Sequence, residues 1–138
     1  TLIEKVIASG KTKISIGEET AIISFFVGQK IVANDPFKNN FKKFKDEIIE
    51  KYKSRGLVKE KNNYIFTDKS LDNFFFIGLI KEIFPNAKVI NCKRNPLSSI
   101  MSILKNNLGD VSWAHDVNHI FKFFDIYHDK MKIDFNNI

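Results

Sequence analysis

The sequence predicts an α/β fold in which a short parallel sheet is flanked by helices. The segments Tyr64–Thr67 and Lys88–Cys92 are β-rich and mostly apolar, as strands covered on both faces should be. Segments with helical periodicity separate and follow them, and this alternation favours parallel strands. A length of 138 residues indicates a single domain over residues 1–138, and a hydrophobic content of 43% suffices for a core.

The first part of the chain predicts two helices around a short strand. The segment Thr1–Ser9 places its apolar residues on one helical face, and Lys13–Ile16 alternates as a strand would. The turn Gly17-Glu18-Glu19-Thr20 carries two adjacent carboxylates before a helix predicted over Thr20–Val32. Taken alone, these carboxylates are typical of exposed acids at a helix N-terminus, where the helix dipole favours negative charge.

The next helix is predicted over Pro36–Lys53. Asp35 and Pro36 suit the cap and the first helical position, and Ser54-Arg55-Gly56 ends the periodic stretch. Lysines alternate with phenylalanines over Lys38–Lys45, which indicates the solvated face of an amphipathic helix rather than a nucleic-acid-binding stripe. The net charge of +6 nevertheless favours anionic partners, among them nucleotides, sulfated or phosphorylated substrates and nucleic acid.

Polar residues leave the first predicted strand at Asp68-Lys69-Ser70, the edge at which such sheets bind ligands. The helix predicted over Leu71–Phe84 is apolar nearly all round and is therefore expected to be buried. A last amphipathic helix is predicted over Ala114–Lys132. His115 and His119 within it have the spacing of metal ligands, but no third ligand accompanies them, so we expect no metal site.

A candidate anion site lies in Ala87–Asn107, where the second strand stops and a helix is predicted from Pro96. Asn95 can cap this helix, and its free N–H groups would attract an anion. Arg94, Ser98 and Ser102 are spaced by four and four, which places a guanidinium and two hydroxyls in a row. A surface arginine and solvated serines explain the same spacing, so both interpretations stay open.

Cys92 is the only cysteine, so no intrachain disulfide can form, and a reducing compartment is indicated. No apolar run reaches the length of a membrane span, and the sequence does not begin with the basic region of a signal peptide. We therefore expect a cytoplasmic protein without a membrane span.

The stretch Thr67–Ser102 carries Asp-Lys after a strand, a Phe-Pro-Asn-Ala turn, and Arg-x-Pro with a serine eight residues after the arginine. It resembles sulfotransferases that use 3'-phosphoadenosine-5'-phosphosulfate (PAPS), particularly the branch of tyrosylprotein and bacterial repeat-linked sulfotransferases. The resemblance implies a P-loop-NTPase-like three-layer fold and PAPS as the sulfonate donor, with no metal. The family's arginine and serine that bind the donor's 3'-phosphate fall on Arg94 and Ser102, and Ser98 lies in the same row.

The start of the chain resembles the same family. The helix Thr1–Ser9 and the Gly-Glu-Glu after it resemble the segment behind the family's 5'-phosphosulfate loop, whose last residue falls on Thr1 and is implied to contact the donor. The second glutamate of that motif, the proposed general base of tyrosylprotein sulfotransferases, falls on Glu19. The lysine of Asp-Lys, which sits near the transferred sulfonate, falls on Lys69. Trp113–Met131 resembles an aromatic-rich helix of the repeat-linked members.

The family's Pro-Arg/Lys-Ser-Gly-Thr loop would precede Thr1, and a segment that closes over the donor would follow the last helix. The resemblance therefore implies the middle of a sulfotransferase, truncated at both ends. We expect such a chain to be a poor catalyst by itself, because the loop supplies donors to the leaving phosphate. Exposed sheet edges would favour self-association, so a homo-oligomer is among the expected states.

The resemblance implies transfer of a sulfonate from PAPS to an acceptor hydroxyl or amine, carried by a peptide, a sugar or a small molecule. Three alternatives stay open: an inactive nucleotide-binding remnant of the family, a phosphoryl-transfer enzyme and a basic nucleic-acid-binding α/β domain. Specific binding of adenosine 3',5'-bisphosphate separates the family interpretation from the nucleic-acid interpretation, because nucleic-acid binding would weaken steeply with salt.

Overall fold

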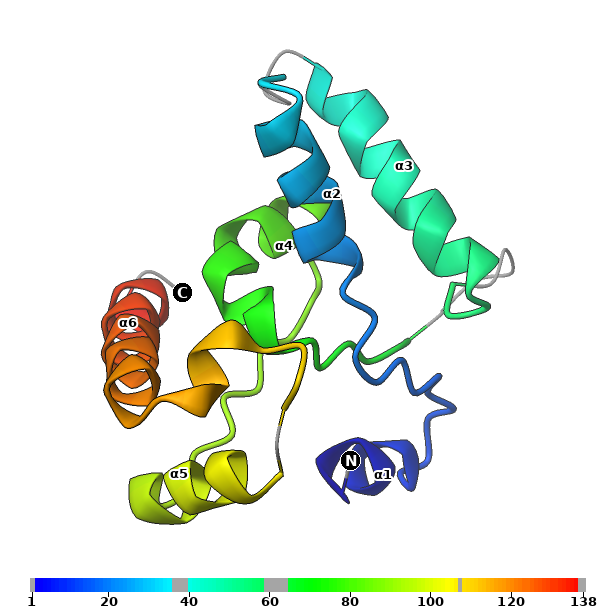
Figure 1. Ribbon diagram of the computed structural model, residues 1–138. Coiled ribbons are helices and arrows are strands. Elements are labelled where there is room, and N and C mark those ends of the chain that lie inside the picture. The colour runs from blue at the N-terminus through cyan, green and yellow to red at the C-terminus, as the bar shows by residue number, and fades with distance from the viewer. Residues whose placement is uncertain (1, 36–39, 59–64, 107, 137–138) are drawn as a thin grey trace. The chain divides into compact units, whose positions relative to one another are not determined.

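The computed structural model describes residues 2–35, 40–58, 65–106 and 108–136, and it is built from helices (Figure 1). The chain divides into two compact units, Thr1–Pro85 and Asn86–Ile138. The single domain expected over residues 1–138 stays a prediction. The first unit contains α1 (Leu2–Ala8), α2 (Ile22–Val32), α3 (Phe41–Ser54), the 3₁₀ helix η2 (Leu71–Phe76) and α4 (Ile77–Ile83). The second contains α5 (Pro96–Lys105), the 3₁₀ helix η3 (Ser112–His115) and α6 (Val117–Asn136).

The predicted α/β fold is wrong. Within the described ranges no sheet forms, so the P-loop-NTPase-like three-layer arrangement is not present. The expected strand at Lys88–Cys92 is irregular, and Ile90 within it is 60% exposed. All that the described residues keep of the expected sheet is an isolated parallel bridge between Ser15 and Phe66. Residues 59–64, and with them part of the other expected strand, lie outside the described residues.

The physical reason is that apolar character alone does not make a strand. A parallel strand needs neighbours that take up its N–H and C=O groups, and the sequence pattern cannot report whether such neighbours exist. Apolar side chains can be buried against rings and helices instead. Phe66 does this, because its ring lies 4.9 Å from the ring of Tyr52 and 5.7 Å from that of Phe84.

The core of the first unit lies between α2, α3 and the η2–α4 segment. The helices α2 and α3 lie side by side (Figure 1). In α3 the apolar residues Phe44 and Ile48 are buried, whereas Lys42 and Lys43 on the other face are exposed, as the amphipathic pattern predicts. The buried residues of this core are Ile22, Ile23, Val27, Phe44, Ile48, Tyr52, Leu57, Val58 and Ile83.

Local sequence signals set the helix ends. At the end of α3, Gly56 has a φ of 73°, and the N–H of Leu57 donates to the carbonyl of Tyr52 at 3.1 Å, which is a Schellman arrangement. The predicted end at Gly56 is therefore confirmed. The start expected at Pro36 lies outside the described residues, and α3 is instead capped by Asn40, which accepts from the N–H of Lys43 at 3.3 Å.

The second unit packs α5 and α6 against η3. The ring of Trp113 stacks on Phe123 with centroids 3.8 Å apart, and the hydroxyl of Tyr127 donates to Asn91. Ile100 and Ile120 are buried here. Among the described residues of the whole chain, no helix has both the length and the hydrophobicity that a bilayer span requires.

Candidate functional site

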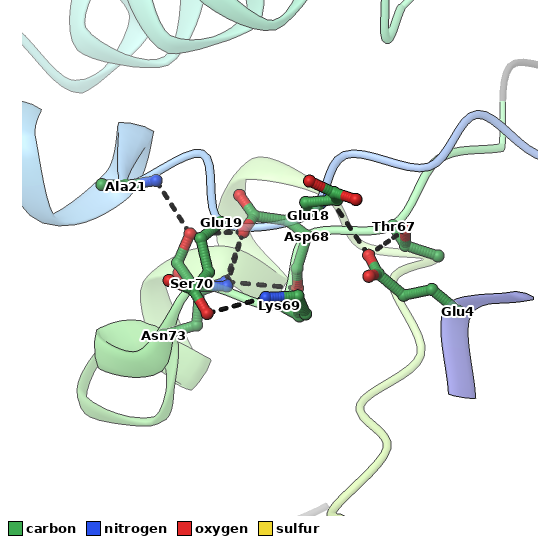
Figure 2. Close-up of polar contacts among 9 residues, drawn as sticks. All are labelled: Glu4, Glu18, Glu19, Ala21, Thr67, Asp68, Lys69, Ser70 and Asn73. Atoms are coloured by element: carbon green, nitrogen blue, oxygen red, sulfur yellow. Dashed lines mark hydrogen bonds and ion pairs between the residues drawn. The ribbon is translucent and has the colours of Figure 1, made fainter. Parts of the chain in front are cut away.

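Two chain segments that are far apart in sequence lie side by side in the first unit. The N–H of Ser15 donates to the carbonyl of Ile65 at 2.9 Å, and the N–H of Thr67 donates back to Ser15 at 3.0 Å. Further along, the N–H of Lys69 donates to the carbonyl of Glu18 at 2.9 Å. The Gly-Glu-Glu turn therefore runs parallel to the segment that carries Asp-Lys (Figure 2).

This alignment brings together Glu19 and Lys69, the two residues expected to be catalytic. The Lys69 Nζ donates to the Glu19 Oε1 at 2.7 Å (Figure 2). The side chain of Glu19 is 67% exposed and that of Lys69 is 27% exposed. An ion pair with this exposure contributes little to stability, about 0–1 kcal/mol. Because both side chains are partly exposed to solvent, the Glu19 carboxylate and the Lys69 ammonium can contact a ligand.

Beside this pair lies Asp68, which the sequence analysis did not single out as a site residue. Its Oδ2 accepts from the hydroxyls of Thr20 at 2.5 Å and Tyr52 at 2.6 Å. Its Oδ1 accepts from the hydroxyl and the N–H of Ser70 at 2.6 and 2.9 Å, and from the amide of Asn73 at 3.1 Å. A carboxylate that accepts this many hydrogen bonds is held in one position and orientation.

The hydrogen bonds decide the charge of this cluster. Burial alone would raise the pKa of Asp68, but the bonds from Ser70, Thr20 and Tyr52 outweigh it and hold the pKa below its ordinary value. Burial and the adjacent Asp68 carboxylate raise the pKa of the Tyr52 phenol well above its usual range. At neutral pH Asp68 is therefore an anion, and Tyr52 is a neutral donor to it.

Two hydroxyls connect this anion to the start of α2. The Thr20 Oγ1 accepts from the N–H of Ile22 at 3.2 Å, and the Ser70 Oγ accepts from the N–H of Ala21 at 2.8 Å. Both hydroxyls donate onward to Asp68. Glu18 and Ala21 both have left-handed backbones, with φ of 54° and 51°, which costs about 1 kcal/mol each. The strained turn is held in place by these bonds.

A second carboxylate supports the turn from α1. Glu4 is only 4% exposed, and its Oε1 accepts from the Thr67 hydroxyl at 2.7 Å and from the N–H of Glu18 at 3.2 Å (Figure 2). The Thr67 Oγ1 in turn accepts from the N–H of Gly17 at 3.3 Å. The sequence offered no signal for Glu4, because a single acid on a short helix is ordinarily exposed.

The residues expected to bind the donor's 3'-phosphate lie in the second unit, around the start of α5. Asn95 caps this helix as predicted, accepting from the N–H of Ser98 at 3.2 Å, and Pro96 is its first residue. Arg94 precedes the cap and is exposed. Within the described ranges, no hydrogen bond or ion pair involves its side chain.

The two serines of α5 are four residues apart and lie on one side of the helix. Ser98 is exposed, whereas Ser102 is half-buried and its hydroxyl accepts from the amide of Asn106 at 3.1 Å. The expected convergence of Arg94 and Ser102 on one anion stays a prediction. Thr1, the remaining expected donor contact, lies outside the described residues.

The described residues contain no group of three or more histidine, cysteine or acidic side chains that could hold a metal ion. The two histidines with metal-ligand spacing belong to different elements, since His115 ends η3 and His119 lies in α6. Their separation in sequence therefore does not place them on one helical face.

Comparison with known proteins adds one finding to this geometry. A family model described as "Sulfotransferase family" matches residues 1–135. Searches of curated proteins and of solved structures give no significant match. The family match extends over both units and includes the Glu19–Lys69 pair and the α5 start.

Proposed function

Because this chain belongs to the sulfotransferase family, we propose that it transfers a sulfonate from PAPS to the hydroxyl or amine of an acceptor. The observation that carries the proposal is the contact of 2.7 Å between Lys69 Nζ and Glu19 Oε1. A base and a cation side by side are what such a transfer requires, since one group must take a proton and another must meet negative charge.

We assign the general base to Glu19. Its carboxylate is exposed enough for an acceptor to approach, and the strained backbone around it is held by buried partners. The proton of the acceptor group would move to a Glu19 carboxylate oxygen. Lys69 would stabilise the negative charge near the transferred group with its ammonium, which lies at the end of a segment fixed by Asp68.

The contacts to the donor's 3'-phosphate are assigned to residues of the second unit by their chemistry. A guanidinium suits a phosphate because it donates in a fork, and Arg94 is exposed in front of a capped helix start. Ser98 and Ser102 add hydroxyls on one side of that helix, and Thr1 is assigned to the 5'-phosphosulfate by resemblance alone. When bound, PAPS supplies a sulfonate that is activated by its phosphate leaving group.

The test compares Glu19→Gln with Glu18→Gln, which alters the neighbouring, exposed carboxylate and serves as the matched control. Labelled sulfonate is followed from PAPS to a panel of hydroxyl and amine acceptors, and adenosine 3',5'-bisphosphate binding is measured by calorimetry. Glu19→Gln should lower transfer by about 100-fold or more, the usual contribution of a general base, and leave bisphosphate affinity unchanged. Glu18→Gln should keep both.

Equal activity of the two variants would remove Glu19 from the reaction. If the protein fails to bind the bisphosphate and instead binds nucleic acid with a steep salt dependence, the basic charge serves a nucleic-acid-binding function and the proposal is wrong.

A further inference from the structure

We infer that Thr20 and Asp68 are positioning residues, whose hydrogen bond holds the Glu19 carboxylate against the Lys69 ammonium. The inference rests on the function proposed above for Glu19 and Lys69. It goes beyond that function because it assigns a role to two side chains that need not touch donor or acceptor.

The first argument is the register of the contacts. Three of the bonds between the turn and the Asp-Lys segment involve Glu18, Glu19 or Thr20: Lys69 N–H to Glu18 carbonyl at 2.9 Å, Lys69 Nζ to Glu19 at 2.7 Å, and Thr20 hydroxyl to Asp68 at 2.5 Å. The Thr20–Asp68 bond joins the residue after Glu19 to the residue before Lys69, so it lies directly beside the ion pair in both segments. Losing it would leave, on the α2 side of Glu19, the bond from the Ala21 N–H to the Ser70 hydroxyl and the exposed ion pair itself.

The second argument is the difference in burial. Thr20 is 4% exposed, whereas Glu19, the residue before it, projects a side chain that is 67% exposed. A solvent-exposed pair does not hold two long side chains in one geometry by itself, because the loss of side-chain entropy offsets the attraction. The partly buried bond between the Thr20 hydroxyl and the Asp68 carboxylate supplies the constraint that the ion pair lacks.

The third argument is that further hydrogen bonds fix the Asp68 carboxylate in place. Tyr52 on α3 donates to the same Asp68 oxygen, and Ser70 and Asn73 donate to the other. Thr20 is the member of this set that itself belongs to the turn carrying Glu19, whereas Ser70 reaches the chain after that turn, at the Ala21 N–H. Asn73 donates to the same carboxylate from η2, and among the described contacts no bond joins it to that turn, which makes it a matched control.

The test uses carbodiimide coupling, which joins a carboxylate and an amine in direct contact into an amide that mass spectrometry locates. The Glu19–Lys69 cross-link is measured against Lys30–Asp35, a pair with the same distance of 2.7 Å and exposures of 26% and 52%. Thr20→Val should lower the Glu19–Lys69 yield by about fivefold or more, the factor expected for one ordinary hydrogen bond. Thr20→Ser should restore it, and Asn73→Ala, which removes a donor to Asp68 away from the turn, should leave it unchanged.

The cross-link needs neither donor nor acceptor, so its outcome is separate from that of the proposed function. In the transfer assay, Thr20→Val should lower kcat by about tenfold or more with the KM for PAPS unchanged, because the reacting groups are displaced while the phosphate contacts remain. Absence of both transfer and specific adenosine 3',5'-bisphosphate binding by the unmodified protein would refute the proposed function and leave the cross-linking result standing.

The inference is overturned if Thr20→Val keeps the Glu19–Lys69 yield, or if Asn73→Ala lowers it equally, since the effect would then be one of general stability. It is also overturned if the unmodified protein forms the Lys30–Asp35 cross-link but not the Glu19–Lys69 one. Should Thr20→Val fail to fold, Thr20→Cys replaces it, because a thiol of similar size is only a weak donor.

Discussion

Replacing Gly17 by alanine tests how closely the Gly-Glu-Glu turn approaches the segment that carries Asp-Lys. A Cβ at this position would lie 2.0 Å from the carbonyl oxygen of Thr67 and 3.2 Å from a methyl carbon of Leu57. The oxygen belongs to the backbone and cannot rotate away as a side chain would. The two segments must therefore separate to admit a single methyl group.

The magnitude follows from what that separation disturbs. Overpacking by one carbon costs about 1–3 kcal/mol when side chains can adjust, and a contact of 2.0 Å with backbone belongs at the upper end. The bond from the Gly17 N–H to Thr67 and that from the Glu18 N–H to Glu4 would also lengthen. We expect Gly17→Ala to lower the free energy of unfolding by about 3 kcal/mol.

Gly28→Ala is the matched control. Gly28 lies within α2, and a Cβ there would meet nothing within 4 Å. Because glycine is a poor residue inside a helix, Gly28→Ala should raise the free energy of unfolding by about 0.5–1 kcal/mol. Urea unfolding followed by circular dichroism measures both values on one scale. A Gly17→Ala protein within about 0.5 kcal/mol of the unmodified one would refute the close approach.

Three further predictions concern charge and capping. Because the folded-state pKa of Asp68 lies below its ordinary value of 3.8, its carboxylate stabilises the protein above that pH, and this contribution is lost as the pH falls through the folded-state pKa. Asp68→Asn should therefore lower stability at pH 7 and flatten the acid part of the stability curve from urea unfolding, whereas parallel acid slopes would contradict the assignment. Asn95→Ala should lower the free energy of unfolding by about 1 kcal/mol, because the N–H of Ser98 loses its acceptor; an unchanged value would show that the cap is dispensable. Arg94→Ala should weaken adenosine 3',5'-bisphosphate binding by about tenfold or more in calorimetry, and Lys93→Ala, an exposed neighbouring cation, should weaken it less; equal losses would reduce the role of Arg94 to general charge.

The end of α3 and the start of α5 were predictable because their capping partners are close in sequence. Gly56 supplies the left-handed conformation that ends α3, and Asn95 with Pro96 starts α5. Each of these signals is satisfied within five residues, so no knowledge of distant chain segments is needed. The face of α3 that is buried follows from periodicity for the same reason.

The site was predictable in part. Glu19 and Lys69 were identified through resemblance to a family, but their contact depends on two segments 50 positions apart. Asp68 was missed as a site residue, although its bonds to the N–H and hydroxyl of Ser70 are a local Asx pattern that the sequence Asp-Lys-Ser allows. Its hydrogen bond to Thr20 spans 48 positions, and the local sequence around Asp68 does not indicate such a distant partner.

The sequence by itself determined where α3 ends and where α5 begins, which face of α3 is apolar, and the motifs that resemble the sulfotransferase family. Only the tertiary structure decided that Lys88–Cys92 is not a strand, that Ser15 and Phe66 form an isolated bridge, and that Asp68 gathers hydroxyls from distant segments. Helical hydrogen bonds join residues four positions apart, so the local sequence pattern is enough to predict them. A strand, a carboxylate satisfied by distant hydroxyls and an ion pair such as Glu19–Lys69 all require partners from elsewhere in the chain, and folding brings those partners together.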